Sequence, residues 1–151
     1  MLTLSRVIAG GFGCGCVPLA AGTIASAVAA VTGAAMLLVS PWLVAAAGLL
    51  AIIIGCAAVH AARVEGDPGW VVIDEFAGQW ITLAALSRPS WLGLIIGFVL
   101  FRLLDITKLG PVGWADRQHG VFGIMMDDVI AGVIAALLLA AVRLAWPAAG
   151  L

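Results

Sequence analysis

Two adjacent pairs of acids are the residues whose type and spacing could do chemistry in this chain. Asp74-Glu75 and Asp127-Asp128 each stand at the beginning of an apolar segment, and Asp105 lies between them. Helix capping explains one acid per helix, and for Asp128 alone it remains an alternative. Doubled acids on helices that meet at one face repel one another unless a hard cation such as Mg²⁺ neutralises them. We therefore predict five metal ligands: Asp74, Glu75, Asp105, Asp127 and Asp128.

Three basic residues accompany these acids along the chain: Arg102, Lys108 and Arg117. Arg102 precedes Asp105 by three residues, so the two side chains share a helix face and can pair. Cationic groups beside a carboxylate-bound metal could bind the oxygens of a phosphate group. The rival interpretation is that the bases extend toward the membrane interface, which fits Arg88 and Arg143 better.

Other potential ligands and catalytic groups are less clearly arranged. Cys56 and His60 are four residues apart and could join Cys14 and Cys16 at a metal, but no other residues have zinc-site spacing, and small buried thiols are the favoured interpretation. His119, in a Gly-containing loop, is either a general acid or base or a loop histidine without a role. A net charge of −1 gives no electrostatic footprint for nucleic acid.

The composition places the chain in a lipid bilayer. Of its 151 residues 64% are hydrophobic and only 10% are charged. Strand-like alternation is absent, and backbone that spans lipid must satisfy its own hydrogen bonds as helix. We predict an all-α fold, a small multi-helix membrane bundle forming a single domain over residues 1–151. About five apolar helices are expected: Thr23–Val39, Trp42–Ala62, Val71–Leu86, Trp91–Leu104 and Asp128–Trp146.

The order of these segments predicts where the charges lie. If all five cross the membrane, three connections share one face: the Gly-rich entry, the Arg63–Asp67 loop and the Leu104–Asp127 loop. Five of the seven basic residues then fall on this face, and the positive-inside bias makes it cytoplasmic. The sequence therefore predicts an acidic site at the cytoplasmic interface of a multi-pass protein.

Three blocks of sequence resemble the phosphatidylglycerophosphatase A family. They are Pro18–Ser26, Val72–Ile81, and the long run from Phe101–Lys108 through Gly123–Gly132. The chain departs from the family pattern at Ala21 and Ala25 and lacks one base before Trp114, while every acidic motif position is retained.

The resemblance implies Mg²⁺-dependent removal of the terminal phosphate from phosphatidylglycerophosphate, a phospholipid, in a bacterial inner membrane. It implies catalytic roles for Asp74, Asp105 and Asp128, and phosphate or substrate contacts from four further residues: Thr23, Arg102, Lys108 and Arg117. Attack by water and a phosphorylated aspartate both remain open, as does the oligomeric state. The alternative function is a non-enzymatic membrane protein such as a cation transporter subunit, since acids within a membrane also mark ion paths.

Overall fold

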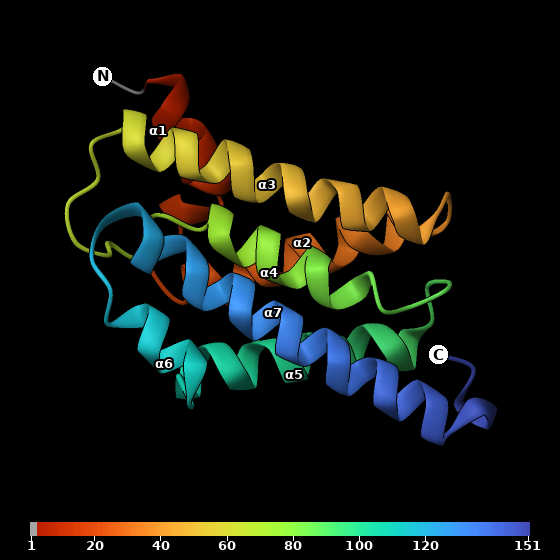
Figure 1. Cartoon of the computed structure of the whole chain (residues 1–151). Helices are drawn as coiled ribbons and strands as arrows, with labels where there is room; N and C mark the ends of the chain where they lie inside the picture. The colour runs from red at the N-terminus through yellow and green to blue at the C-terminus, as the bar shows by residue number, and fades with distance from the viewer. Residues whose placement is uncertain (1–2) are drawn as a thin grey trace.

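A computed structural model describes residues 3–151, and its regular elements are all helical (Figure 1). In chain order they are α1 (Leu4–Ala9), η1 (Gly11–Cys16), α2 (Ala21–Leu37), α3 (Pro41–Ala61), α4 (Ile73–Leu83), α5 (Trp91–Thr107), α6 (Pro111–Asp116), α7 (Gly120–Ala145) and η2 (Pro147–Ala149). No strand occurs between residues 3 and 151, which confirms the prediction of an all-α fold.

The helix ends follow local signals in the sequence. Ser40 caps α3 by accepting a hydrogen bond from the Trp42 backbone N–H, and Ser90 caps α5 in the same way from Gly93, both at 3.1 Å. The fifth segment was predicted to start at Asp128, but α7 begins at Gly120. Asp127 and Asp128 therefore lie inside the helix, where backbone N–H groups are already bonded, and the capping interpretation of Asp128 is wrong.

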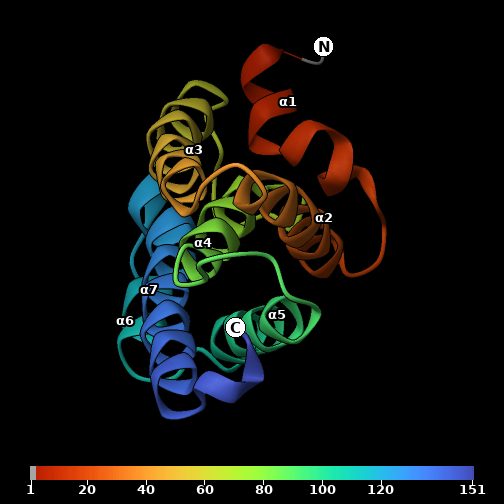
Figure 2. The ribbon, with the colours of Figure 1, turned by 90° about the vertical axis from the view of Figure 1, so that its right-hand side faces the viewer.

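The longer helices run back and forth between two ends of the molecule, and α4 lies at its centre. Helix α4 packs against α2, α3, α5 and α7, which surround it when the bundle is viewed from its end (Figure 2). Two of the three connections predicted to share one face, the Arg63–Asp67 loop and the part of the Leu104–Asp127 segment between α5 and α7, lie at the end where α4 begins (Figure 1). The other end holds the α2–α3 and α4–α5 turns.

A pair of glycines brings α4 and α7 unusually close. A Cβ on Gly132 of α7 would lie 2.8 Å from the Cα of Gly78 in α4, and a Cβ on Gly78 would meet the Asp128 carbonyl oxygen at 2.5 Å. The Thr82 hydroxyl, one turn further along α4, donates to the carbonyl oxygens of both glycines. Only residues without a side chain permit this backbone contact, as at close helix crossings in membrane proteins.

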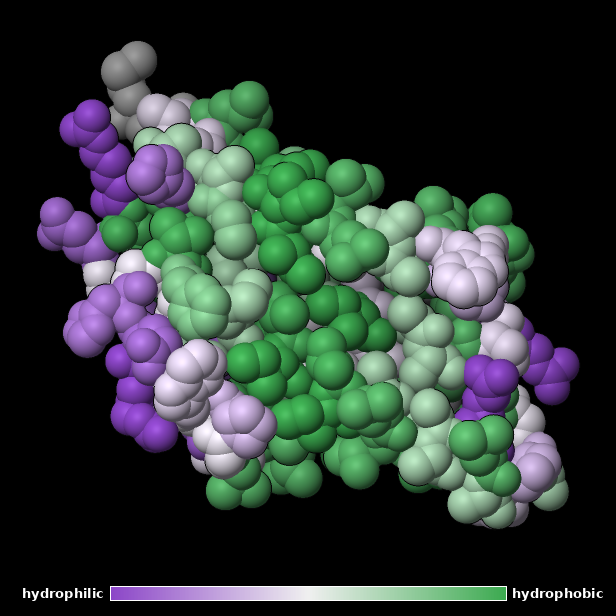
Figure 3. Space-filling view, viewed as in Figure 1, coloured by the Kyte–Doolittle hydropathy of each residue, from purple (hydrophilic) through white to green (hydrophobic). Residues whose placement is uncertain are grey.

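The outside of the bundle is apolar, whereas several polar side chains lie inside it. Large hydrophobic side chains such as Leu49, Ile53 and Leu137 are more than half exposed, while Ser26 and Gln79 are fully buried. Figure 3 shows one face of this surface, with an apolar band between two more polar ends. Water would penalise such a surface, and a lipid environment would not.

Two helices within the described residues, α3 and α7, are long and apolar enough to cross a membrane by length and composition. The prediction of about five spanning helices is therefore not confirmed. Helix α4 has 11 residues and a length of about 16 Å at 1.5 Å per residue, which is half the hydrocarbon thickness of a bilayer. Its predicted segment, Val71–Leu86, includes two non-helical residues before Ile73 and a turn after Leu83.

Arg143 also differs from expectation. Its guanidinium is half-buried and donates a 2.6 Å hydrogen bond to the carbonyl oxygen of Ala85, just beyond α4. The bond connects α7 to the end of α4, so Arg143 does not extend freely toward the membrane interface. That interpretation still fits Arg88, which is exposed.

Candidate active site at the charged end of the bundle

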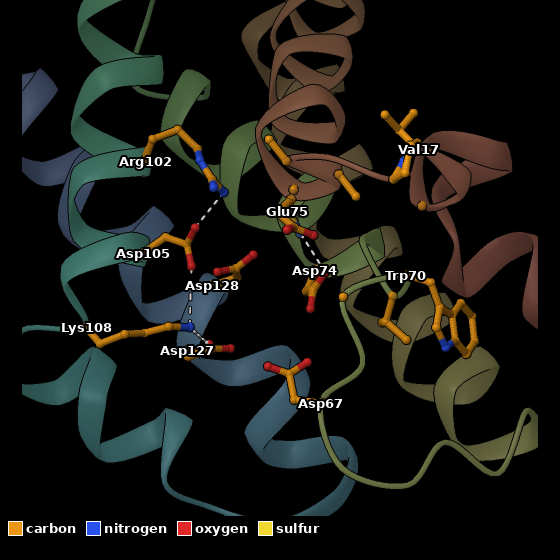
Figure 4. A pocket seen from close by; sticks show the side chains of 17 residues that line it. Val17, Asp67, Trp70, Asp74, Glu75, Arg102, Asp105, Lys108, Asp127 and Asp128 are labelled. Atoms are coloured by element: carbon orange, nitrogen blue, oxygen red, sulfur yellow. Dashed lines mark hydrogen bonds and ion pairs between the residues drawn. The ribbon is translucent and has the colours of Figure 1, made fainter.

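A polar cavity of about 540 Å³ opens at the end of the bundle where α4 begins (Figure 4). It is enclosed by the start of α2, the loop before α4, and the charged turns of α4, α5 and α7. Six carboxylates and two cationic side chains line it: Asp67, Asp74, Glu75, Asp105, Asp127, Asp128, Arg102 and Lys108. The cavity therefore carries an excess of negative charge.

The acids form two overlapping groups of three. Oxygen atoms of Asp74, Glu75 and Asp128 lie within 4.8 Å of one another, and so do oxygen atoms of Asp105, Asp127 and Asp128. Asp128 belongs to both groups because it projects from α7 between α4 and α5. This spacing is short enough for one cation to bind three carboxylates at once.

The glycine crossing explains why acids from α4 and α7 meet. Asp74 lies four residues before Gly78, and Asp128 lies four residues before Gly132. Residues four apart share a helix face, so the closest approach of the two backbones is followed, one turn nearer the charged end, by the two carboxylates. Glycine at the crossing thus sets the distance between the acid pairs.

Arg102 is held at the edge of the cavity by three oxygen acceptors. Its Nη1 donates to Asp105 Oδ2 at 2.5 Å and to Ser26 Oγ at 3.4 Å, and its Nη2 donates to Thr23 Oγ1 at 3.3 Å. The guanidinium is thereby fixed between α5 and α2, and its planar set of donors suits a phosphate group.

Lys108 reaches into the same cavity from the end of α5. Its φ of 50° is in the left-handed region, which ends the helix there. The ammonium group pairs with Asp127, with Asp105 at 3.4 Å and with Asp116 at 3.2 Å. Burial on its own would lower the pKa of Lys108, but the hydrogen bond to Asp127 and the surrounding acids outweigh it and raise that pKa. The lysine is therefore held in its charged form.

Two buried carboxylate oxygens in the cavity have no hydrogen-bond partner: Glu75 Oε2 and Asp127 Oδ1. A buried charged oxygen without a partner is costly, so these two atoms are suited to bind a cation. Two cations cannot balance six acids, and a phosphate group would add further negative charge. The donor set, which is all oxygen, fits one or more hard divalent cations such as Mg²⁺.

The structure brings together most of the residues predicted from the sequence. All five predicted metal ligands line the cavity with Arg102 and Lys108, and Thr23 lies directly behind Arg102. Arg117 and His119 are exposed and line a neighbouring hollow, so the cavity geometry gives neither of them a contact. Within residues 3–151 the groups of potential metal ligands consist of carboxylates alone, so the cysteines and His60 form no such group.

Four polar residues near the cavity were not predicted to take part: Ser26, Asp67, Gln79 and Asp116. Ser26 contacts Arg102 and lies in the first family-like block, so its position there was the available signal. Asp67 lines the cavity and Asp116 pairs with Lys108, which only the folding of their loops decides. Gln79, one turn after Glu75, is fully buried and neither amide atom has a partner.

Comparisons with known proteins find relatives that match most of the chain. The family model described as Phosphatidylglycerophosphatase A matches residues 7–143. Phosphatidylglycerophosphatase A of Escherichia coli is 42% identical over 147 residues, covering 94% of this chain and 85% of that protein. The Haemophilus influenzae protein of the same name is 33% identical, covering 95% and 91%. A Bacteroides thetaiotaomicron protein provisionally named phosphatidylinositol-3-phosphatase is 36% identical, covering 93% and 94%. No solved structure matches the chain.

Proposed function

This chain belongs to the phosphatidylglycerophosphatase A family, and we propose that it is an Mg²⁺-dependent phosphatase that converts phosphatidylglycerophosphate to phosphatidylglycerol. The observation that carries the proposal is the convergence of five buried or half-buried acids, Arg102 and Lys108 on one cavity. A phosphate at the head of a lipid could enter this cavity at the end of the bundle while its acyl chains remain beside the apolar helices.

The two groups of acids would hold the metal: Asp74, Glu75 and Asp128 in one, and Asp105, Asp127 and Asp128 in the other. Bound Mg²⁺ supplies charge neutralisation of the phosphoryl oxygens and lowers the pKa of bound water. Glu75 Oε2 and Asp127 Oδ1 support this assignment, because they are buried carboxylate oxygens of the cavity that have no hydrogen-bond partner.

The cationic residues would bind and orient the phosphate group. Arg102 is already positioned by Asp105, Thr23 and Ser26, so little conformational freedom is lost when it binds an anion. Lys108 pairs with Asp127, whereas Arg102 pairs with Asp105. Lys108 would therefore offset the negative charge in another part of the cavity. Arg117 remains a proposed contact from the exposed loop after α6.

A carboxylate of the cluster would take the proton from the attacking nucleophile. Asp74, Asp105 and Asp128 all line the cavity in which the phosphate would react. Asp105 is already paired with two cationic side chains, Arg102 and Lys108. Asp74 and Asp128 carry no such cationic partner, which makes them the stronger candidates for accepting a proton.

We also propose that the protein is a multi-pass protein of a bacterial inner membrane whose site faces the cytoplasm. The apolar band around the bundle and the two long apolar helices support the membrane location. Five of the seven basic residues belong to the segments at the charged end, which the positive-inside bias assigns to the cytoplasm. The transporter alternative is not favoured, because the acids gather at one end and the named relatives are phosphatases.

Phosphate release from phosphatidylglycerophosphate in detergent micelles tests the proposal. The purified protein should release phosphate with Mg²⁺, and Asp128→Asn should lose most of that activity because Asp128 belongs to both acid groups. Release at the same rate by Asp128→Asn, or none from the unaltered protein with any divalent cation, would contradict it.

A further inference from the structure

An apolar groove lies on the lipid-facing side of the bundle between α2 and α5. Its first part, of about 320 Å³, is lined only by hydrophobic side chains: Ala27, Ala30, Val31, Ala34, Trp91, Leu94, Ile95 and Phe98. A second hollow of about 400 Å³ continues it toward Leu38 and Pro89, and the two share Ala34, Trp91 and Leu94. The groove therefore follows the seam between the two helices.

The groove is in register with the polar cavity. On α2, Ala27 and Thr23 are four residues apart, and on α5, Phe98 and Arg102 are four residues apart. The two residues of each pair share a helix face. Thr23 and Arg102 therefore lie on the same helix faces as the groove lining, one turn nearer the charged end. These two residues are joined by a 3.3 Å hydrogen bond at the edge of the acidic cavity.

We propose that this groove binds one acyl chain of the phospholipid substrate, with the phosphate beyond Arg102 in the acidic cavity. The inference rests on the proposed function and assigns the route by which the lipid reaches the site, sideways from the membrane between α2 and α5. A cation at one end, and a lining that is apolar along the rest except for Ser90 at the far end, match the headgroup and the acyl chain of such a lipid.

The length of the groove agrees with this occupant. From Ala27 to Leu38, the residue that caps the end of α2, the groove covers a rise of eleven residue steps, about 16 Å at 1.5 Å per residue. One leaflet of a bilayer has a hydrocarbon thickness of about 15 Å, half of the whole core. An acyl chain anchored by its headgroup at Arg102 would therefore be covered by the groove over the depth of its own leaflet.

Small residues on α2 create the space. Ala27, Ala30 and Ala34 lie on the groove side, opposite the larger Leu94, Ile95 and Phe98 of α5. Filling this space should weaken binding of long acyl chains without touching the acids. Ala27 is exposed and Ala34 half-buried, so a tryptophan at either position would occupy the groove.

Kinetics of groove-filling variants test the inference with phosphatidylglycerophosphate carrying two oleoyl chains. We expect Ala27→Trp and Ala34→Trp to lower kcat/KM about tenfold or more, mainly through KM. Ala46→Trp is the control, because Ala46 is exposed near the start of α3, toward the end of the bundle where Ala34 lies, and is outside the groove; it should change kcat/KM less than about twofold. Groove variants that match this control would overturn the inference.

Photo-cross-linking of the unaltered protein gives a second readout that needs no variant to fold. The probe is phosphatidylglycerophosphate with a diazirine in the middle of one acyl chain, and adducts are mapped by mass spectrometry. We expect adducts within residues 27–38 and 91–98. Adducts confined to α3 and α7 would overturn the groove. So would adducts confined to α1 and η1, where another hollow meets the cavity at Gly15 and Trp70.

The failure of this inference is distinguishable from failure of the proposed function. If the unaltered protein releases no phosphate from this lipid, the phosphatase proposal fails, and the cross-linking map still reports whether the groove binds the chain. If it releases phosphate but the adducts lie elsewhere, only the groove is excluded.

Discussion

Replacing Gly132 by alanine tests whether the α4–α7 crossing sets the geometry of the acid cluster. The added Cβ would lie 2.8 Å from Gly78 Cα and 2.9 Å from its carbonyl carbon. Carbon atoms in favourable contact are about 3.5–4.0 Å apart, so the two helices must separate by roughly 1 Å. Neither neighbouring atom can rotate away, because both belong to the backbone of α4.

The separation should reach the acids one turn away. Asp128 would move from Asp74 and Glu75, and a misplacement of about 1 Å at reacting groups costs roughly 100-fold in rate. We expect kcat of Gly132→Ala to fall by about that factor. Overpacking should cost about 1–3 kcal/mol of stability, offset by up to about 1 kcal/mol from the better helix propensity of alanine.

Gly97→Ala is the matched control. It is the same substitution inside a helix, but its Cβ would meet the Cδ2 atoms of Leu83 at 3.1 Å and Leu139 at 3.3 Å, which are movable side-chain ends. We expect kcat within about threefold of the unaltered protein and little change in Tm. Phosphate release in micelles and thermal melting followed by circular dichroism measure both quantities. A Gly132→Ala protein with unchanged Tm and kcat would refute the role of the crossing.

Four further predictions concern the charged cavity and its surroundings. EDTA should abolish phosphate release and added Mg²⁺ restore it, because clustered carboxylates need a hard cation, and full turnover in metal-free buffer would contradict the metal assignment. Arg102→Ala should lower kcat/KM about 30- to 1000-fold, or about 2–4 kcal/mol, while the exposed Arg88→Ala changes it less than about threefold; equal small effects would make Arg102 a structural residue. Lys108→Met should lower the free energy of unfolding, measured in EDTA, by about 1–3 kcal/mol, because Asp127 loses its cationic partner. The loss stays small because the lysine is partly exposed and solvent screens its charge. An unchanged melting curve would exclude this contribution. Gln79→Leu should stabilise the protein by about 1–2 kcal/mol in melting experiments, because both buried amide atoms lack partners; a destabilised variant would reveal a bound water or another partner.

The sequence predicted which residues gather at the charged cavity better than it predicted the architecture. Acid pairs, an interleaved arginine and a lysine are visible as residue types, and helical periodicity already places Arg102 beside Asp105. The number of spans was less predictable, because a hydrophobic run does not reveal where a helix stops. The run Val71–Leu86 contains only the 11-residue α4, while α7 extends eight residues before the predicted start at Asp128.

Contacts between distant segments could not be read from the sequence. The sequence predicted that Arg143 extends toward the membrane interface. In the structure it donates a hydrogen bond to the carbonyl oxygen of Ala85, at the junction of α7 and α4. Ser26 and Asp116 became partners of Arg102 and Lys108 only through the packing of α2 and α6. Arg117 stood in the same charged loop as Lys108, yet that loop carries its side chain to the outside.

Sequence alone determined that this protein is helical and largely apolar, and it predicted that carboxylates with Arg102, Lys108 and Arg117 carry its chemistry. Those properties depend on residue type and on neighbours three or four positions apart, which a helix fixes locally. Tertiary structure decided that the acids form two groups sharing Asp128, and that an apolar groove leads to them. Both depend on how closely helices approach, and that distance is set by side-chain volume at crossings such as Gly78–Gly132.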